Sequence, residues 1–184
     1  FFALKLQRYL HDHHLHPRLL AELIAKSLRN GAITPHAWRR NPLSVDDILG
    51  GTMVNDPLTK YMFCSPSEGG AAIILTSTER AKQLTDRSVE LRAVELRTRR
   101  FGTFEVFSPW LSDDITQGAS VHAAAAAFEA AGIGPHDIDV AQIQDTEAGA
   151  ELMHLAECGF CDDGEQGELI MSGALEIDGR LPVN

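Results

Sequence analysis

Apolar side chains recur with helical spacing near the start of this 184-residue chain. Apolar residues between Leu4 and Leu10 fall on one helical face, and a second stripe runs from Leu19 to Leu28. Pro17 suits the first residue of the second helix, and Ser44 with Asp47 has the form of a capping box. Together with glycine and turn residues, such patterns predict helices over residues 1–14, 17–30, 45–49, 79–84, 122–132 and 147–157.

Other segments have the composition of strands. Residues 69–77, GGAAIILTS, pass from small to β-branched residues and predict a strand buried on both faces. Residues 89–107 alternate enough for one or two strands, and residues 137–144 predict another. Because helices separate these strands, the expected fold class is α/β, with βαβ units and a mixed, largely parallel sheet between helices.

Composition and charge narrow the class of protein. Hydrophobic residues make up 44% of the chain and charged residues 23%, as in a globular protein with a core. The net charge of −10 argues against a nucleic-acid partner, and no apolar run is long enough for a membrane span. Three cysteines, an odd number, fit reduced thiols, so we expect a cytoplasmic protein.

Three short motifs suggest metal or redox chemistry but lack the residues it requires. HDHHLH (11–16) has no i, i+4 pair with a carboxylate on one helical face. Cys158-Gly-Phe-Cys161 lies at the end of a predicted helix, where the dipole disfavours a thiolate. Glu151-x-x-His154 is half of a di-iron motif, without the helical bundle that such a site needs. We therefore predict no metal site.

Two polar segments are better candidates for a site. Gln144, Asp145, Thr146 and Glu147 follow the predicted strand 137–144, and ligands of α/β proteins bind at such strand ends. Capping of the next helix by Asp145 or Thr146 is an equally simple explanation. Residues 64–70, CSPSEGG, predict a tight turn whose glycines permit close approach of a ligand or of a neighbouring backbone.

Several segments together resemble the thiolase superfamily, in particular proteins of the sterol-carrier and lipid-transfer type. The most specific are RRNPLSVDDIL (39–49) followed by DPL (56–58), and AGIGPHDIDV (131–140). The resemblance implies a fold with two similar βαβ halves. It also implies a fragment that lacks the N-terminal half and the C-terminal catalytic loop. Residues 1–88 are then the end of the first half with its lid-like helices, and residues 89–184 open the second half.

The resemblance also implies roles for the polar segments. Ser67 and Gly69 match a Ser-Asp-Gly turn that lines the acyl-CoA channel, with Glu68 in place of the aspartate. Sterol-carrier thiolases have a His-Asp-Ala-Phe step where this chain has Gln144 to Glu147. Gln144 retains a donor for an oxyanion but cannot act as an acid or base. Asp145 or Glu147 would then orient it or move a proton.

An acyl-CoA-handling enzyme is therefore the leading hypothesis, an acyltransferase that makes or breaks a carbon–carbon bond next to a thioester. A retro-aldolase acting on steroid side-chain CoA thioesters is an alternative within the same class. A non-catalytic lipid or acyl-CoA carrier, or a scaffold subunit, is the alternative from another class. The resemblance implies coenzyme A thioester as substrate, no covalently bound cofactor, a homodimer, and a small OB-fold companion protein for the aldolase type. Tyr61 is a more distant acid/base candidate.

Overall fold

The computed structural model describes residues 2–98 and 118–184, which are mainly helical. None of the described helices is long and apolar enough to cross a membrane. The elements are α1 (Phe2–Asp12), α2 (Arg18–Ile33), α3 (Val45–Leu49), β1 (Met53–Asn55), β2 (Leu58–Thr59), η1 (Lys60–Met62), α4 (Thr78–Leu84), α5 (Ala119–Ala131), η2 (Pro135–Asp137), α6 (Ala148–Glu157) and α7 (Gln166–Met171).

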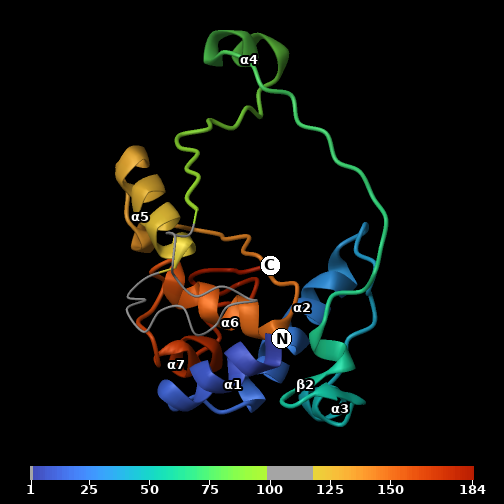
Figure 1. Ribbon diagram of the computed structural model, residues 1–184. Helices are drawn as coiled ribbons and strands as arrows, with labels where there is room; N and C mark the ends of the chain where they lie inside the picture. The colour runs from blue at the N-terminus through green and yellow to red at the C-terminus, as the bar shows by residue number, and fades with distance from the viewer. Residues whose placement is uncertain (1, 99–117) are drawn as a thin grey trace.

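Helix α6 lies at the centre of the body and packs against α1, α2, α5 and α7 (Figure 1). Leu6, Leu20 and Leu23 from the first two helices are fully buried, as are Leu152 and Leu155 of α6. The apolar stripes of the sequence therefore face one another across this contact, and burial of such side chains is worth roughly 1.5–3 kcal/mol each. Both predicted parts of the chain, 1–88 and 89–184, contribute to this core. The division itself stays a prediction.

The helices begin and end close to the predicted positions. Ser44 and Asp47 form the capping box of α3, as expected. Pro17 is the N-cap residue of α2 and not its first residue, and this helix continues through Gly31 to Ile33. Gly132 ends α5 with a φ of 69°, a left-handed conformation that glycine adopts without strain. Helix α7 was not predicted.

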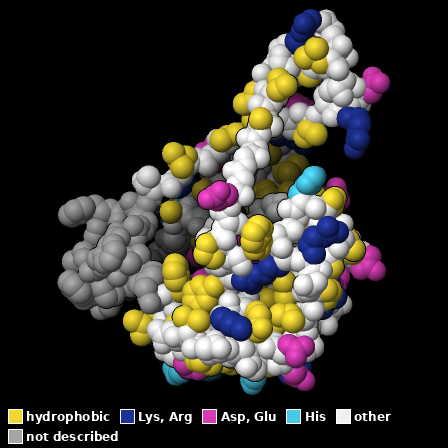
Figure 2. Space-filling model, turned by 90° about the vertical axis from the view of Figure 1, so that its right-hand side faces the viewer, with side chains coloured by type: hydrophobic (Ala, Val, Ile, Leu, Met, Phe, Trp, Pro, Cys, Tyr) yellow, Lys and Arg dark blue, Asp and Glu magenta, His cyan; other side chains and the backbone are white. Residues whose placement is uncertain are grey.

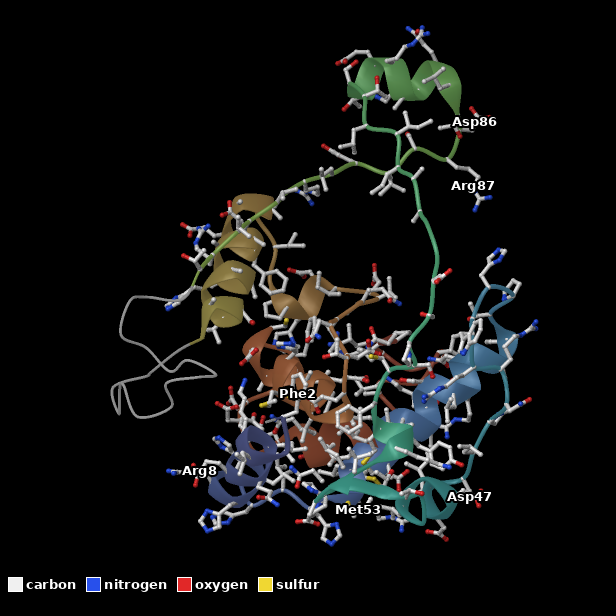
Figure 3. All side chains as sticks on the ribbon, turned by 45° about the vertical axis from the view of Figure 1, so that its right-hand side comes forward. Phe2, Arg8, Asp47, Met53, Asp86 and Arg87 are labelled. Carbon is white, nitrogen blue, oxygen red and sulfur yellow. The ribbon has the colours of Figure 1, made fainter. Side chains whose placement is uncertain are left out.

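The buried strand predicted at residues 69–77 is wrong for the described structure. This segment forms no strand, and its apolar side chains Ile73, Ile74 and Leu75 are 87%, 88% and 75% exposed. It belongs to an arm that rises from the body with α4 at its tip (Figure 1). Hydrophobic side chains are spread along this arm (Figure 2), and Asp86 and Arg87 lie far from Phe2 and Arg8 of α1 (Figure 3).

The arm is extended because a strand needs partners that are remote in sequence. The described residues contain one ladder, the antiparallel pair β1 and β2, and neither of these strands pairs with residues 69–77. Residues 89–98 are likewise without strand structure, and residues 99–107 of that prediction lie outside the described residues. The α/β prediction therefore holds for the helices but not for the largely parallel sheet.

The third predicted strand, residues 137–144, survives only as an extended segment. Ala141 forms a single parallel bridge with Val183. The Ile143 amide donates to the side-chain oxygen of Asn184 over 2.9 Å. The segment thus runs in the predicted direction beside the end of the described chain, and it delivers residues 144–147 to the start of α6.

Candidate functional site

The polar step at residues 144–147 forms a corner between an extended segment and the N-terminus of α6. Gln144, Asp145 and Thr146 are exposed, whereas Glu147 is buried. The Glu147 carboxylate accepts a hydrogen bond from the Gly149 amide over 2.6 Å and caps the helix. The expectation that Asp145 or Thr146 caps α6 is therefore wrong, because the chain turns into the helix one residue later.

Close packing explains why glycine follows the cap. A Cβ atom on Gly149 would lie 2.7 Å from the Glu147 carboxylate and 2.8 Å from Leu6, so no side chain fits there. Burial raises the pKa of Glu147, although hydrogen bonds from the Gly149 and Ala150 amides act to lower it. The cap fixes the direction in which the exposed corner residues leave the helix.

The Gln144 side chain is held by two hydrogen bonds. Its amide nitrogen donates to the Thr146 hydroxyl over 2.7 Å. Its amide oxygen lies 3.1 Å from Nε2 of His154, two turns into α6. The other ring nitrogen of His154, Nδ1, lies 2.5 Å from the Glu157 carboxylate. One N–H of the Gln144 amide is not needed for these contacts, and the side chain is exposed.

A second segment runs along the corner. Phe63 forms an antiparallel bridge with Glu147, and the Cys64 amide donates to the Thr146 carbonyl over 3.0 Å. Ser65, the next residue, accepts a hydrogen bond from the Arg39 guanidinium over 2.7 Å. The 64–70 turn therefore starts directly beside residues 146 and 147, as a shared site requires.

A cationic pocket lies on the other side of this segment. It has a volume of about 540 Å³, and Lys60 Nζ stands 4.7 Å from the centre of the Tyr61 ring. Among the described residues, Arg40 and Lys60 have no ion-pair partner. None of the lining residues that the structure describes is a carboxylate, so the pocket favours an anion with an apolar or planar part. The lining residues are Leu28, Trp38, Arg39, Arg40, Asn41, Leu43, Lys60 and Tyr61.

The two predicted binding residues stand apart from the corner. Ser67 and Gly69 lie in the exposed chain that leads into the arm, and a Cβ atom on Gly69 would meet nothing within 4 Å. Neither residue has a hydrogen bond to Gln144 among the described residues. The structure therefore places Cys64, the first residue of their turn, beside the corner, but not Ser67 or Gly69 themselves. Tyr61, the more distant acid/base candidate, lines the cationic pocket.

The histidine run 11–16 and the pair Cys158 and Cys161 show no geometry suited to metal or redox chemistry in the described structure. His14 lies two residues after α1 and has a φ of 55°, and the ring centre of His13 lies 4.4 Å from that of Tyr9. Burial raises the pKa of the Cys158 thiol, and burial with nearby carboxylates raises that of Cys161 to about 12. Neither thiol is a thiolate near neutral pH, so this pair supplies no nucleophile. Among the described residues no group of three potential ligands could hold a metal ion.

Glu151 has a different partner from the one that its motif suggests. Its carboxylate lies 2.5 Å from Lys26 Nζ of α2, and both side chains are almost completely buried. Lys26 also donates to the Val183 carbonyl over 2.7 Å. The Asn30 side chain donates to the Asn184 carbonyl over 2.9 Å. These contacts fasten α2, α6 and the end of the described chain together below the corner.

The sequence reasoning missed His154 and the pocket cations. The sequence places His154 between Glu151 and Glu157, but the only function that this spacing suggests is half of a di-iron motif, whereas the structure pairs His154 with Glu157. Arg39 and Arg40 follow Trp38, a basic and aromatic run that was read only as part of a family motif. The spacing along α6 therefore predicts that His154 and Glu157 lie side by side. The pocket could not be predicted in this way, because two separate segments, residues 38–43 and 60–61, line it together.

Comparisons with known proteins agree on one family. Residues 110–184 match the family described as thiolase C-terminal domain-like. The chain is 31% identical to the acetyl-CoA acetyltransferase of Methanothermobacter thermautotrophicus, over 100% of this chain and 46% of the relative. It is 27% identical to the 17-hydroxy-3-oxo-4-pregnene-20-carboxyl-CoA lyase of Mycobacterium tuberculosis, over 99% and 47%.

Two further similarities concern a carrier protein and a solved structure. Sterol carrier protein 2 of Rattus norvegicus is 30% identical over 86% of this chain and 29% of its own length. The solved Ltp2-ChsH2(DUF35) aldolase superposes with a TM-score of 0.88 at 27% identity, covering 99% of this chain and 48% of that chain. The chain thus spans less than half the length of each of these relatives.

Proposed function

We propose, because this chain belongs to the thiolase superfamily, that the protein binds an acyl-CoA thioester and makes or breaks a carbon–carbon bond next to its carbonyl. Such reactions place negative charge on the thioester oxygen, and a fixed hydrogen-bond donor aimed at that oxygen lowers the barrier. In this proposal Gln144 is that donor. Asp145 is the exposed carboxylate beside it, and Glu147 fixes the start of the helix from which the corner is displayed.

The observation that carries the proposal is the restrained amide of Gln144. Two hydrogen bonds fix it while one N–H stays available on an exposed side chain. An oriented neutral donor suits an oxyanion because it loses little conformational entropy during the reaction and needs no proton transfer. Helix capping does not explain the two hydrogen bonds of the Gln144 side chain, because Glu147 already caps α6.

The cationic pocket supports a substrate with phosphate groups. Coenzyme A has phosphates and an adenine ring, and the pocket offers three cationic side chains beside Trp38 and Tyr61. The segment 61–65 connects the pocket to the corner. One ligand that follows this segment would therefore place its nucleotide end in the pocket and its thioester at the corner. In this proposal Ser67 and Gly69 contact the part of the ligand that extends beyond the corner.

Retro-aldol cleavage is the second candidate, and the chemistry of Gln144 favours it over thiolytic acyl transfer. Gln144 cannot exchange a proton in place of a histidine, but it can stabilise the enolate that carbon–carbon cleavage leaves behind. The solved neighbour is itself an aldolase.

A cleavage assay with and without free coenzyme A tests the function and separates its two forms. Purified protein containing this chain is incubated with β-ketoacyl-CoA and with β-hydroxyacyl-CoA esters of steroid-like side chains. Thiolysis requires free coenzyme A, whereas retro-aldol cleavage proceeds without it. Tight binding of these thioesters with no product under either condition would contradict the enzyme and leave the carrier.

Removal of charge from the pocket is expected to weaken coenzyme A binding. Arg40→Ala and Lys60→Ala should each raise the Kd about tenfold or more, because a hydrogen bond to a charged group contributes roughly 1.5–3 kcal/mol. Isothermal titration calorimetry with coenzyme A measures the effect. Arg80→Ala on α4 is the matched control and should leave the Kd unchanged. Equal Kd values for all three variants and the unaltered protein would contradict the pocket assignment.

Assembly and location complete the proposal. The solved neighbour pairs Ltp2 with ChsH2(DUF35), which supports a small companion protein for this one. A homodimer follows from the family resemblance and a cytoplasmic location from the odd number of cysteines, and both stay predictions. Light scattering of the purified protein, alone and with a co-expressed companion, measures the assembly directly.

A further inference from the structure

We propose that His154 is a positioning residue that, with Glu157, fixes and polarises the Gln144 amide. This inference rests on the proposed function, because it assigns a purpose to the orientation of the oxyanion donor. His154 does not touch the substrate in this proposal. It acts through its contact of 3.1 Å with the Gln144 amide oxygen.

The hydrogen-bond partners of the two ring nitrogens determine how His154 contacts Gln144. An amide oxygen only accepts, so Nε2 of His154 must donate to Gln144. Nδ1 faces a carboxylate oxygen of Glu157 at 2.5 Å. Burial by itself raises the pKa of Glu157, but the hydrogen bond and charge of His154 outweigh it and lower that pKa. The Glu157 carboxylate accepts at the other ring nitrogen, so the ring is held between two acceptors, one at each nitrogen.

The groups around His154 come from α1, α5 and the two ends of α6. Glu157 and Glu147 on α6 both interact electrostatically with it. Lys5 of α1 faces the same two carboxylates, and Ser120 of α5 reaches Glu157 with a hydrogen bond. The His154 side chain is 21% exposed and that of Glu157 23%, so the pair is partly shielded from water. The ring is therefore held in a partly buried setting between groups of three elements, which restricts its orientation.

The hydrogen bond from His154 to the amide oxygen has two effects on Gln144. It fixes the side chain from one end while Thr146 holds the other end. It also draws electron density toward the oxygen, which strengthens the remaining N–H as a donor, since hydrogen bonds in a chain polarise one another. His154 therefore stabilises charge on the thioester oxygen without contacting the substrate.

A double-mutant cycle in the full protein tests this role. His154→Phe keeps a flat ring without donors and is expected to lower kcat about tenfold, with KM changed less than twofold. In a Gln144→Ala background the same change should have no further effect, because the group through which His154 acts is gone. His11→Phe, on the exposed end of α1, is the control and should be silent in both backgrounds. Equal losses from His154→Phe in both backgrounds would overturn the proposal.

A measurement that needs no turnover separates this inference from the proposed function. In protein with ¹⁵N-labelled glutamine side chains, the Gln144→Ala variant identifies the Gln144 NH₂ signals. These signals should report an ordered side chain in the unaltered protein and a mobile one in His154→Phe. Failure of the cleavage assay with this pattern present contradicts only the function. A Gln144 amide that is equally ordered, or equally mobile, in both proteins contradicts the positioning role even if the enzyme is active.

Discussion

Replacement of Glu151 by alanine is expected to destabilise the protein by about 3–5 kcal/mol, because it leaves a buried charge without its partner. Lys26 is 4% exposed, and its ammonium is satisfied by Glu151 and by the Val183 carbonyl. After the change only the carbonyl remains. Burial raises the pKa of the Glu151 carboxyl, while the Lys26 charge acts to lower it. Urea-induced unfolding followed by circular dichroism measures the free energy of unfolding.

The matched variants separate the charge effect from the loss of packing. The double change Lys26→Met with Glu151→Leu removes both charges and fills the space with apolar groups. It is expected to recover most of the stability, since buried ion pairs are often replaceable in this way. Glu22→Ala breaks the partly exposed pair with Arg18 on the outside of α2 and should cost about 1 kcal/mol or less. A Glu151→Ala cost no larger than that of Glu22→Ala would contradict the argument.

The helices were predictable because their signals are local. The stripe from Leu19 to Leu28 needs only its own period to define a buried face, and Ser44 with Asp47 closes a cap within four residues. The error at Ile73 and Ile74 has the opposite cause. Their β-branched side chains favour a strand, but a strand exists only when another lies beside it. Composition specifies the preference of this segment and not the presence of its partner.

The corner at residues 144–147 was predictable as a change of structure, but its internal contacts were not. The change from apolar to polar residues at Gln144 marks the corner from the sequence alone. The cap at Glu147 was missed because its geometry depends on the approach of Leu6 to Gly149. The role of His154 depends on the turn of the chain at the corner, which brings Gln144 back against the second turn of α6. Local spacing indicates which residues share a helical face, but not what faces them.

Loss of the Gln144 amide is expected to reduce kcat by about 10²–10³, the effect of removing one oxyanion donor. KM should change less than threefold, because the donor acts on charge that develops during the reaction. Gln144→Ala is the direct test in the thioester cleavage assay. Gln144→Glu is expected to be at least as slow, since a carboxylate at this position repels the oxyanion and also has no N–H to donate.

Gln142 provides the control for this prediction. It lies two residues earlier on the same extended segment and is also exposed, but it is not part of the Thr146 and His154 contacts. Gln142→Ala should therefore leave kcat unchanged. A Gln144→Ala variant as active as Gln142→Ala would remove Gln144 from the site. A raised KM with full kcat would assign it to substrate binding. A loss confined to kcat is what an amide aimed at the thioester oxygen requires, since only such a donor discriminates between the substrate and its transition state.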